Sequence, residues 1–264
     1  MKKLFSLFLA AALVCAGLVG CSGSKEDKFD TIKANGELVV YTDPNFEPFE
    51  YVGEGGKYVG VDMDLAQAIA DELGVKLVVN SADFDSIIMA LAGGSGDIAI
   101  SAMTINKDRK KNADFSKPYF STVQYLIVPE GSQLKKMEDL KGKKVGVAVG
   151  YTGSTLIEKE INEGVLKGSG ASFAEYPNAA EAVLDMKNGR VAAVVMDQYV
   201  AQAVVASTSG VTTFELKGGS VEDEDYGVVV PKKNPKLLEA VNKVIDRLTA
   251  DGTIKEWVLK HTGE

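Results

Sequence analysis

The sequence is poor in the side chains on which most metal and nucleophilic sites depend. Its 264 residues contain a single histidine, His261, and two cysteines, Cys15 and Cys21. Zinc-finger, Cys–His protease and histidine-rich metal sites would therefore lack ligands. A Ser-His-Asp triad would have to use His261, which lies close to the C-terminal end of the sequence. We accordingly expect neither a metal site nor a cofactor.

An excess of positive charge is also missing. The sequence has 29 lysines and arginines against 37 aspartates and glutamates, which gives a net charge of −8. A surface of this sign repels phosphate backbones, so we expect no nucleic-acid partner. The remaining composition, 45% hydrophobic and 25% charged, is that of an ordinary soluble globular protein. The length suffices for a hydrophobic core that needs no disulfide or metal.

A long apolar run at the N-terminus has the features of a secretory signal. Lys2 and Lys3 precede an apolar segment over residues 4–19, whose last two residues begin the sequence Leu-Val-Gly-Cys at residues 18–21. This ending resembles a lipobox, at which the signal is cut and the cysteine receives a lipid. We expect a lipoprotein signal peptide over residues 1–20, lipidation of Cys21 and a polar tether over residues 21–35; the alternative is an uncleaved anchor with a free thiol. The protein would then work outside the cytoplasm, held at a bacterial membrane without spanning it.

After the signal, short hydrophobic runs alternate with segments of helical periodicity. Strands are predicted over residues 38–41, 76–79 and 97–103. A helix is predicted over residues 65–73, where apolar residues recur at helical spacing before Gly74, and a shorter one follows Asp85. This β-α-β-α-β order favours a mostly parallel sheet covered by helices.

The same order restarts after residue 125. Strands are predicted over residues 145–149, 173–176 and 191–196. Asn178, three residues before a glutamate, is typical of a helix start, and Asn-Pro at 234–235 predicts a last amphipathic helix. The sequence therefore predicts an α/β protein with two similar halves and a C-terminal helical extension.

Two charged residues at predicted strand ends are the main candidates for a ligand site. The hydroxyl of Thr104 and the guanidinium of Arg109 lie at a strand-to-helix junction, where free backbone N–H groups and a planar cation suit a carboxylate. Asp197 follows a hydrophobic strand, at the end that lines the crevice of open α/β sheets, so it is a candidate for binding a cation. Taken singly, Arg109 is equally consistent with a solvated basic surface and Asp197 with a helix cap.

Aromatic and glycine-rich loops add weaker candidates. Phe46 and Phe84 lie in loops after strands, where they could form a slot around an apolar stem; the alternative is that both belong to the core. The turn over residues 150–153 could bind an anion with its backbone. It lacks the Gly-Lys-Ser/Thr ending of a phosphate loop, so we expect no nucleotide site there.

Six segments, in order, resemble one known family. They read DPNFEPFEY, GVDMDLAQAIADELG, ADFDSIIMAL, GDIAISAMTINKDRKKNADFSKPYF, MEDLKGKKVGVAVG and GRVAAVVMD, and the resemblance covers about residues 36–260. They look like the polar amino-acid substrate-binding proteins of ABC transporters, the extracellular solute-binding protein family 3. The resemblance implies a two-lobed periplasmic-binding-protein-like fold, in which each lobe is a mostly parallel sheet flanked by helices and a two-strand hinge joins the lobes. It places lobe 1 at residues 36–121 plus 227–264, lobe 2 at 127–221, and the hinge near 122–126 and 222–226.

The resemblance also implies roles for individual residues. Arg109 matches the arginine that holds the ligand α-carboxylate, Thr104 the hydroxyl that assists it, and Asp197 the aspartate that takes the α-ammonium. Phe46 and Phe84 match the aromatic pair around the ligand stem. The remaining expected contacts are Asp43 at the ligand side chain, Ser101 and Ala102 through the backbone, and Thr152 or Gly153 in the second lobe.

The function implied by the resemblance is capture of a polar amino acid outside the cytoplasm and its delivery to permease subunits of an ABC transporter. Asp43 favours a basic or amide side chain, because a second carboxylate would face a like charge. We expect a monomer attached to the membrane through its N-terminal lipid, without enzymatic activity. Two alternatives stay open: a dehydratase-like enzyme on the same fold, and a ligand-sensing subunit for a receptor.

Overall fold

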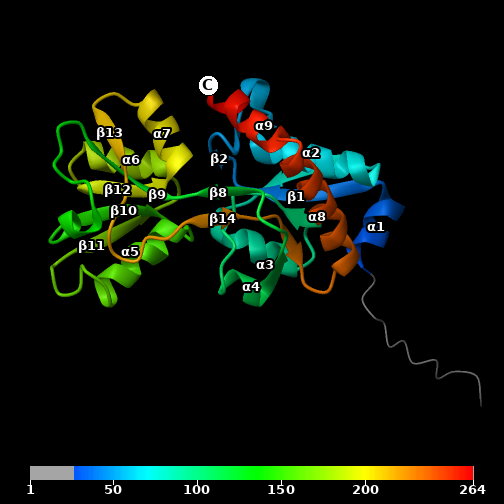
Figure 1. Ribbon diagram of the computed structural model, residues 1–264, viewed down its shortest axis with the longest axis horizontal. Coiled ribbons are helices and arrows are strands. Elements are labelled where there is room, and N and C mark those ends of the chain that lie inside the picture. The colour runs from blue at the N-terminus through cyan, green and yellow to red at the C-terminus, as the bar shows by residue number, and fades with distance from the viewer. Residues whose placement is uncertain (1–26, 264) are drawn as a thin grey trace, which may run out of the picture.

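Two α/β lobes lie side by side in the computed structural model and are joined by a narrow two-stranded ribbon (Figure 1). The structure describes residues 27–263. The predicted signal peptide, the predicted lipidation site Cys21 and the first part of the predicted tether lie outside the described residues. Within them, none of the helices is both long and apolar enough to cross a membrane.

Lobe 1 is built on a five-stranded sheet in the order β5-β1-β6-β15-β7. Its strands are β1 (Glu37–Thr42), β5 (Lys76–Ser81), β6 (Ile98–Ala99), β7 (Ala113–Phe115) and β15 (Val229–Pro231). Strand β1 pairs in parallel with β5 and β6, whereas β15 runs antiparallel to both of its neighbours. Four strands therefore point one way, which confirms the mostly parallel sheet, and β15 is the exception because it enters from the other lobe.

Helices cover both faces of this sheet. They are α1 (Lys28–Asn35), α2 (Val61–Leu73), α3 (Ile87–Ala92), α4 (Arg109–Asn112), α8 (Pro235–Ala250) and α9 (Thr253–Thr262), with the 3-10 turns η1 (Glu54–Gly56) and η2 (Phe84–Ser86). Helix α2 buries the predicted apolar stripe and ends at Gly74, whose φ of 64° is the left-handed cap that favours glycine. The C-terminal helices α8 and α9 pack against α2, so the end of the chain returns to lobe 1.

Part of the range predicted as a tether is folded. Helix α1 begins after Asp27, whose side chain accepts a hydrogen bond from the backbone N–H of Phe29. The Lys28 backbone N–H donates to Asn234 Oδ1 at 2.7 Å, and Ile32 is buried in the core. Residues 28–35 therefore belong to lobe 1, because these contacts fix them against its helices.

Lobe 2 repeats the arrangement with the order β11-β10-β12-β9-β13. Its strands are β9 (Gln124–Pro129), β10 (Lys144–Ala148), β11 (Ser172–Tyr176), β12 (Ala193–Asp197) and β13 (Val211–Glu215); its helices are α5 (Thr152–Asn162), α6 (Ala179–Lys187) and α7 (Gln198–Ser207), with the 3-10 turn η3 (Met137–Leu140). The predicted capping by Asn178 is present, since its side chain accepts a hydrogen bond from the Glu181 backbone N–H at 3.0 Å. Here β9 is the antiparallel strand, and it too has just entered from the other lobe.

The lobes are connected by β8 (Phe120–Thr122) and β14 (Glu224–Tyr226), which pair antiparallel. We call these two strands the connecting ribbon. Each continues directly into the antiparallel strand of a sheet, so the ribbon joins the two sheets. A second small sheet, β2 (Asn45–Phe46), β3 (Glu50–Val52) and β4 (Tyr58–Val59), lies where the sequence predicted a loop around Phe46.

One predicted strand is much shorter than expected. The range 97–103 contains only β6, because the backbone turns at Ala102, whose φ of +41° is incompatible with an extended strand. The turn is stabilised by the buried carboxylate of Asp62, whose Oδ2 accepts the Ala102 N–H at 2.7 Å. It directs residues 102–104 towards the boundary between the lobes.

Candidate functional site

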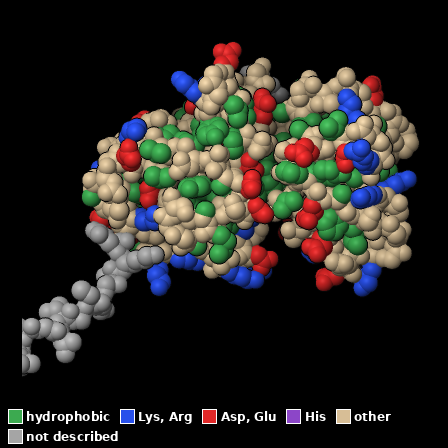
Figure 2. Space-filling view, turned by 180° about the vertical axis from the view of Figure 1, so that it is seen from behind, with side chains coloured by type: hydrophobic (Ala, Val, Ile, Leu, Met, Phe, Trp, Pro, Cys, Tyr) green, Lys and Arg blue, Asp and Glu red, His purple; other side chains and the backbone are tan. Residues whose placement is uncertain are grey.

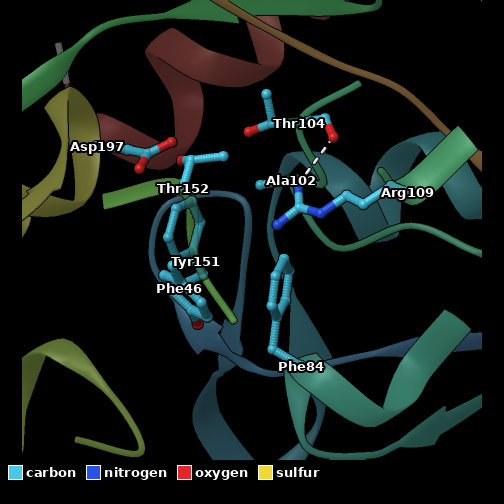
Figure 3. Close-up of a pocket in the computed structure, with 8 residues that line it drawn as sticks. All are labelled: Phe46, Phe84, Ala102, Thr104, Arg109, Tyr151, Thr152 and Asp197. Atoms are coloured by element: carbon cyan, nitrogen blue, oxygen red, sulfur yellow. Dashed lines mark hydrogen bonds between the residues drawn. The ribbon is translucent and has the colours of Figure 1, made fainter. Parts of the chain in front are cut away.

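A pocket lies between the lobes, and both contribute to its wall (Figure 3). It is lined by Phe46, Phe84, Ala102, Thr104 and Arg109 from lobe 1 and by Tyr151, Thr152 and Asp197 from lobe 2. The structure thus brings together seven of the nine residues predicted to bind a ligand. The other two, Asp43 and Ser101, are buried beside the pocket and are absent from its described lining.

Arg109 enters the pocket from lobe 1 at the start of α4. Asn106 positions its backbone by accepting the Arg109 N–H at 2.8 Å, and Nη1 donates to the carbonyl of Thr104 at 2.8 Å. Nη2 donates across the boundary to the carbonyl of Gly150 at 2.9 Å. The guanidinium carbon also lies 5.1 Å from the centre of the Phe84 ring. Burial lowers the pKa of Arg109, although the carboxylates of Glu224 and Asp197 oppose this effect.

Asp197 faces Arg109 from the end of β12 in lobe 2, and Figure 3 shows the two charged groups reaching in from opposite sides. Its carboxylate accepts hydrogen bonds from Gln124 Nε2 at 2.7 Å and from the hydroxyl of Tyr226. Burial and the neighbouring Glu224 raise the pKa of Asp197 to about 7. Asp197 is therefore a buried acid that a cation in the pocket would stabilise in its ionised form.

Glu224 is a site residue that the sequence did not reveal. It belongs to the connecting ribbon, and its Oε2 accepts the hydroxyls of both Thr104 and Thr152 at 2.7 Å. Its Oε1 accepts Gln124 Nε2 at 3.1 Å, so Glu224 and Asp197 share one amide. Thr104 and Thr152 come from different lobes, and Glu224 consequently links both through a single carboxylate oxygen.

The aromatic lining of the pocket contains Tyr151 in addition to the expected pair, Phe46 and Phe84. The ring of Tyr151 contacts both Phe46 and Phe84, at 5.5 Å and 4.5 Å between ring centres, and both contacts are edge-to-face. Its hydroxyl lies 3.5 Å from Asp43 Oδ2 in a long hydrogen bond. Burial, and secondarily Asp43, raise the pKa of Tyr151 well above its usual range, so the phenol is neutral. Phe46 and Phe84 thus both contact a side chain of this protein.

Buried acidic residues and Ser101 form a hydrogen-bonded network behind the pocket. Ser101 donates its hydroxyl to Glu50 Oε1 at 2.9 Å and accepts the Asp43 N–H at 3.0 Å. Glu50 and Asp62 are both fully buried, and burial together with the neighbouring Asp62 carboxyl raises the pKa of Glu50 well above its usual range. Burial likewise raises the pKa of Asp62 to about 6. Glu50 Oε2 is buried without a hydrogen-bond partner, which further disfavours the ionised form of this carboxyl.

The charged and aromatic groups of the pocket suit a dipolar ligand that also carries a side chain. It offers a forked cation on one side, two carboxylates on the other, and aromatic rings between them. Among residues 27–263, His, Cys, Asp and Glu nowhere gather in threes able to hold a metal ion. A signal for Glu224 existed only as the run Val-Glu-Asp-Glu-Asp-Tyr in the predicted crossover, where nothing distinguished one acid from the next.

Comparison with known proteins places this chain in a family. Residues 38–264 match the bacterial extracellular solute-binding proteins, family 3. The L-cystine-binding protein TcyJ of Escherichia coli strain K12 is 32% identical, and the match covers 94% of this chain and 90% of TcyJ. The ABC transporter glutamine-binding protein GlnH of Bacillus subtilis strain 168 is 33% identical, with full coverage of both chains.

A solved structure supports the same placement. An ancestral arginine-binding protein bound to arginine is 43% identical to this chain, with a TM-score of 0.78. The match covers 86% of this chain and 98% of that one. The two-lobed fold is therefore shared across nearly the whole described chain.

Proposed function

The chain belongs to the bacterial extracellular solute-binding proteins, family 3, and from this premise we propose that its pocket binds one free polar amino acid for delivery to the permease of an ABC transporter. The observation that carries the proposal is the placement of Arg109 and Asp197 on opposite lobes of one pocket. A free amino acid carries a carboxylate and an ammonium on the same carbon. It can therefore engage both residues, and both lobes, at once.

The ligand side chain we propose is basic or an amide. Three carboxylates, Asp43, Asp197 and Glu224, lie in or beside the pocket, and Arg109 is the cation in its described lining. A zwitterion neutralises one charge of each sign, so an additional cation or a hydrogen-bond donor on the ligand suits the remaining acids. The named ligands of the relatives, arginine and glutamine among them, support this class.

The surface between the lobes is also acidic on one face. The back of the molecule shows a furrow between the lobes with acidic side chains gathered beside it (Figure 2). Negative charge of this kind raises the local concentration of cations at the surface of the molecule.

We also propose that the protein is held at a bacterial membrane by a lipid on Cys21. The support is the sequence Leu-Val-Gly-Cys after an apolar run with two leading lysines. Cys21→Ala is expected to release the protein from the membrane fraction, because one thiol carries the whole attachment. Cell fractionation after mild washing measures this, and retention of the variant on membranes would contradict the anchor.

A thermal-shift panel of the twenty amino acids tests the proposed ligand class. A ligand at 100 times its dissociation constant stabilises the folded state by about 2.7 kcal/mol. We expect arginine, lysine or glutamine to raise the melting temperature, and glutamate and aspartate to have no effect. Asp43→Asn should reduce the shift with arginine more than with alanine, whereas equal losses would show that Asp43 only shapes the pocket.

Recovery of the ligand separates binding from catalysis. Mass spectrometry after overnight incubation is expected to return the amino acid unchanged, because Arg109 and Asp197 already serve the two charges of the ligand. A dehydrated product would replace the transport proposal with the enzymatic one. A panel without a single shift would contradict both.

A further inference from the structure

The turn that opens α5 carries a tyrosine into the other lobe. Tyr151 follows Gly150, whose φ is +76°. A Cβ at Gly150 would lie 2.9 Å from Asp85 Cβ and 3.3 Å from Asp85 Cα, and both atoms belong to lobe 1. Glycine is therefore required for this close approach. The turn and lobe 1 are in direct contact.

Tyr151 packs against the rings proposed to surround the ligand side chain. The residue is 5% exposed, and its ring makes edge-to-face contacts with both Phe46 and Phe84, the two rings expected to flank the ligand stem. Its hydroxyl reaches Asp43, the acid expected to meet the end of that side chain. The rings of Tyr151 and Phe84 are in contact, so a long ligand side chain cannot enter between them while Tyr151 stays in place.

Gly150, which precedes Tyr151, also contacts a residue proposed to bind the ligand. The carbonyl of Gly150 accepts a hydrogen bond from Arg109 Nη2 at 2.9 Å. Arg109 is the group proposed to hold the ligand α-carboxylate. One short segment of lobe 2 thus satisfies a cation, two rings and a carboxylate of lobe 1 that the ligand would otherwise engage.

We propose that Tyr151 is a specificity-determining gate, whose ring must move away from Phe46 and Phe84 before a long side chain can enter the slot. This inference rests on the proposed amino-acid function. A short side chain, such as that of alanine or serine, stays clear of the slot and binds with Tyr151 in place. A long basic or amide side chain displaces the ring and replaces the neutral phenol at Asp43 with a cation or an amide.

The cost of moving the Tyr151 ring falls on long ligands only, whereas the contact between Arg109 and the Gly150 carbonyl affects every amino acid alike. When the binding-competent state is partly populated, apparent affinity falls by the fraction of molecules in that state. A slot open in about one molecule in ten would weaken arginine binding about tenfold and slow its association by the same factor. Dissociation of bound arginine would be unaffected, because the ring is already out.

The decisive variant is Tyr151→Ala in the full chain, with L-arginine, L-lysine and L-glutamine as long probes and L-alanine and L-serine as short ones. We expect affinity for the long probe that binds best to rise about tenfold. The gain should appear in the association rate, while affinities for the short probes stay within about twofold. Calorimetry and stopped-flow fluorescence give these numbers.

Two further variants separate gating from damage to the fold. Tyr151→Phe keeps the ring and removes only the contact with Asp43, so its gain should be smaller than that of alanine. Tyr176→Ala removes a lobe 2 tyrosine whose hydroxyl also donates to an aspartate, Asp185, at 2.9 Å and which lies outside the pocket lining. It should leave the ratio of long to short affinities unchanged.

The remaining outcomes are distinguishable. Weaker arginine binding by Tyr151→Ala would show that the ring packs on the ligand, and would overturn the gate. Arginine binding by wild type with an unchanged ratio in the alanine variant would overturn the gate and leave the proposed function standing. If neither protein binds any amino acid, the proposed function itself fails. Binding of arginine by the variant alone would be the strongest support for the gate.

Discussion

Replacing Arg109 by alanine is expected to weaken binding of the amino-acid ligand by about tenfold to a hundredfold. A hydrogen bond to a charged group contributes about 1.5–3 kcal/mol net, and about 1.4 kcal/mol corresponds to a factor of ten in affinity. The variant also loses the hydrogen bond from Arg109 to the Gly150 carbonyl, which joins the lobes. Isothermal titration calorimetry with the best ligand of the panel measures the change.

Arg109→Lys tests why arginine is used. Lysine keeps the charge, but it lacks the planar fork that meets both oxygens of a carboxylate. We expect it to recover only part of the affinity, and wild-type affinity in this variant would contradict a bidentate role. Arg190→Ala is the matched control, because Arg190 is an exposed arginine of lobe 2 that pairs with Asp185. It should bind the ligand as wild type does.

The sequence predicted the regular elements because their signals are local. The buried stripe of α2, the start of α6 at Asn178 and the parallel strands around β1 and β10 are all present. The ends of the elements differ from the predicted ones where a tertiary contact competes with the local conformational preference. Residues 97–103 form a short strand because Asp62, far away in the sequence, holds Ala102 in a turn.

The candidate site was predictable where a side chain sits at the end of an element. Arg109 and Asp197 follow strands or begin helices, so topology alone brings them to one crevice. Glu224 depends on the register of the connecting ribbon: it pairs with Thr122, while Asp225 beside it points elsewhere and accepts the hydroxyl of Ser121. In an acidic run, only that register separates the site residue from its neighbour.

The position of the Tyr151 side chain could not be predicted from the sequence of lobe 2. It stands in a glycine-bearing turn, where sequence gives no direction for the side chain. Its partners, Phe46 and Phe84, are far from it in the chain and belong to the other lobe. The contact exists only when the lobes come together, so it is a property of the assembled pocket.

Asp197→Asn is expected to weaken binding by about tenfold to a hundredfold and to remove its pH dependence. In the ligand-free protein the pKa of Asp197 is raised to about 7 by burial and by Glu224. A bound α-ammonium favours the ionised form, so binding below this pKa must expel a proton. Wild-type affinity should therefore be about tenfold higher at pH 8 than at pH 6, whereas that of the asparagine variant should be flat.

Folding stability changes in the opposite direction, which separates a lost contact from a damaged fold. An acid whose pKa is raised by folding contributes stability that is lost as pH rises from 3.8 to about 7. Asparagine carries no charge, so the ligand-free variant should melt at an equal or higher temperature than wild type at pH 8. Asp225→Asn, on the same ribbon as Glu224 but exposed, should alter neither affinity nor its pH profile. If the Asp197→Asn variant kept the pH profile, another group would be responsible for the titration. The proposal that Asp197 binds the α-ammonium would then be wrong.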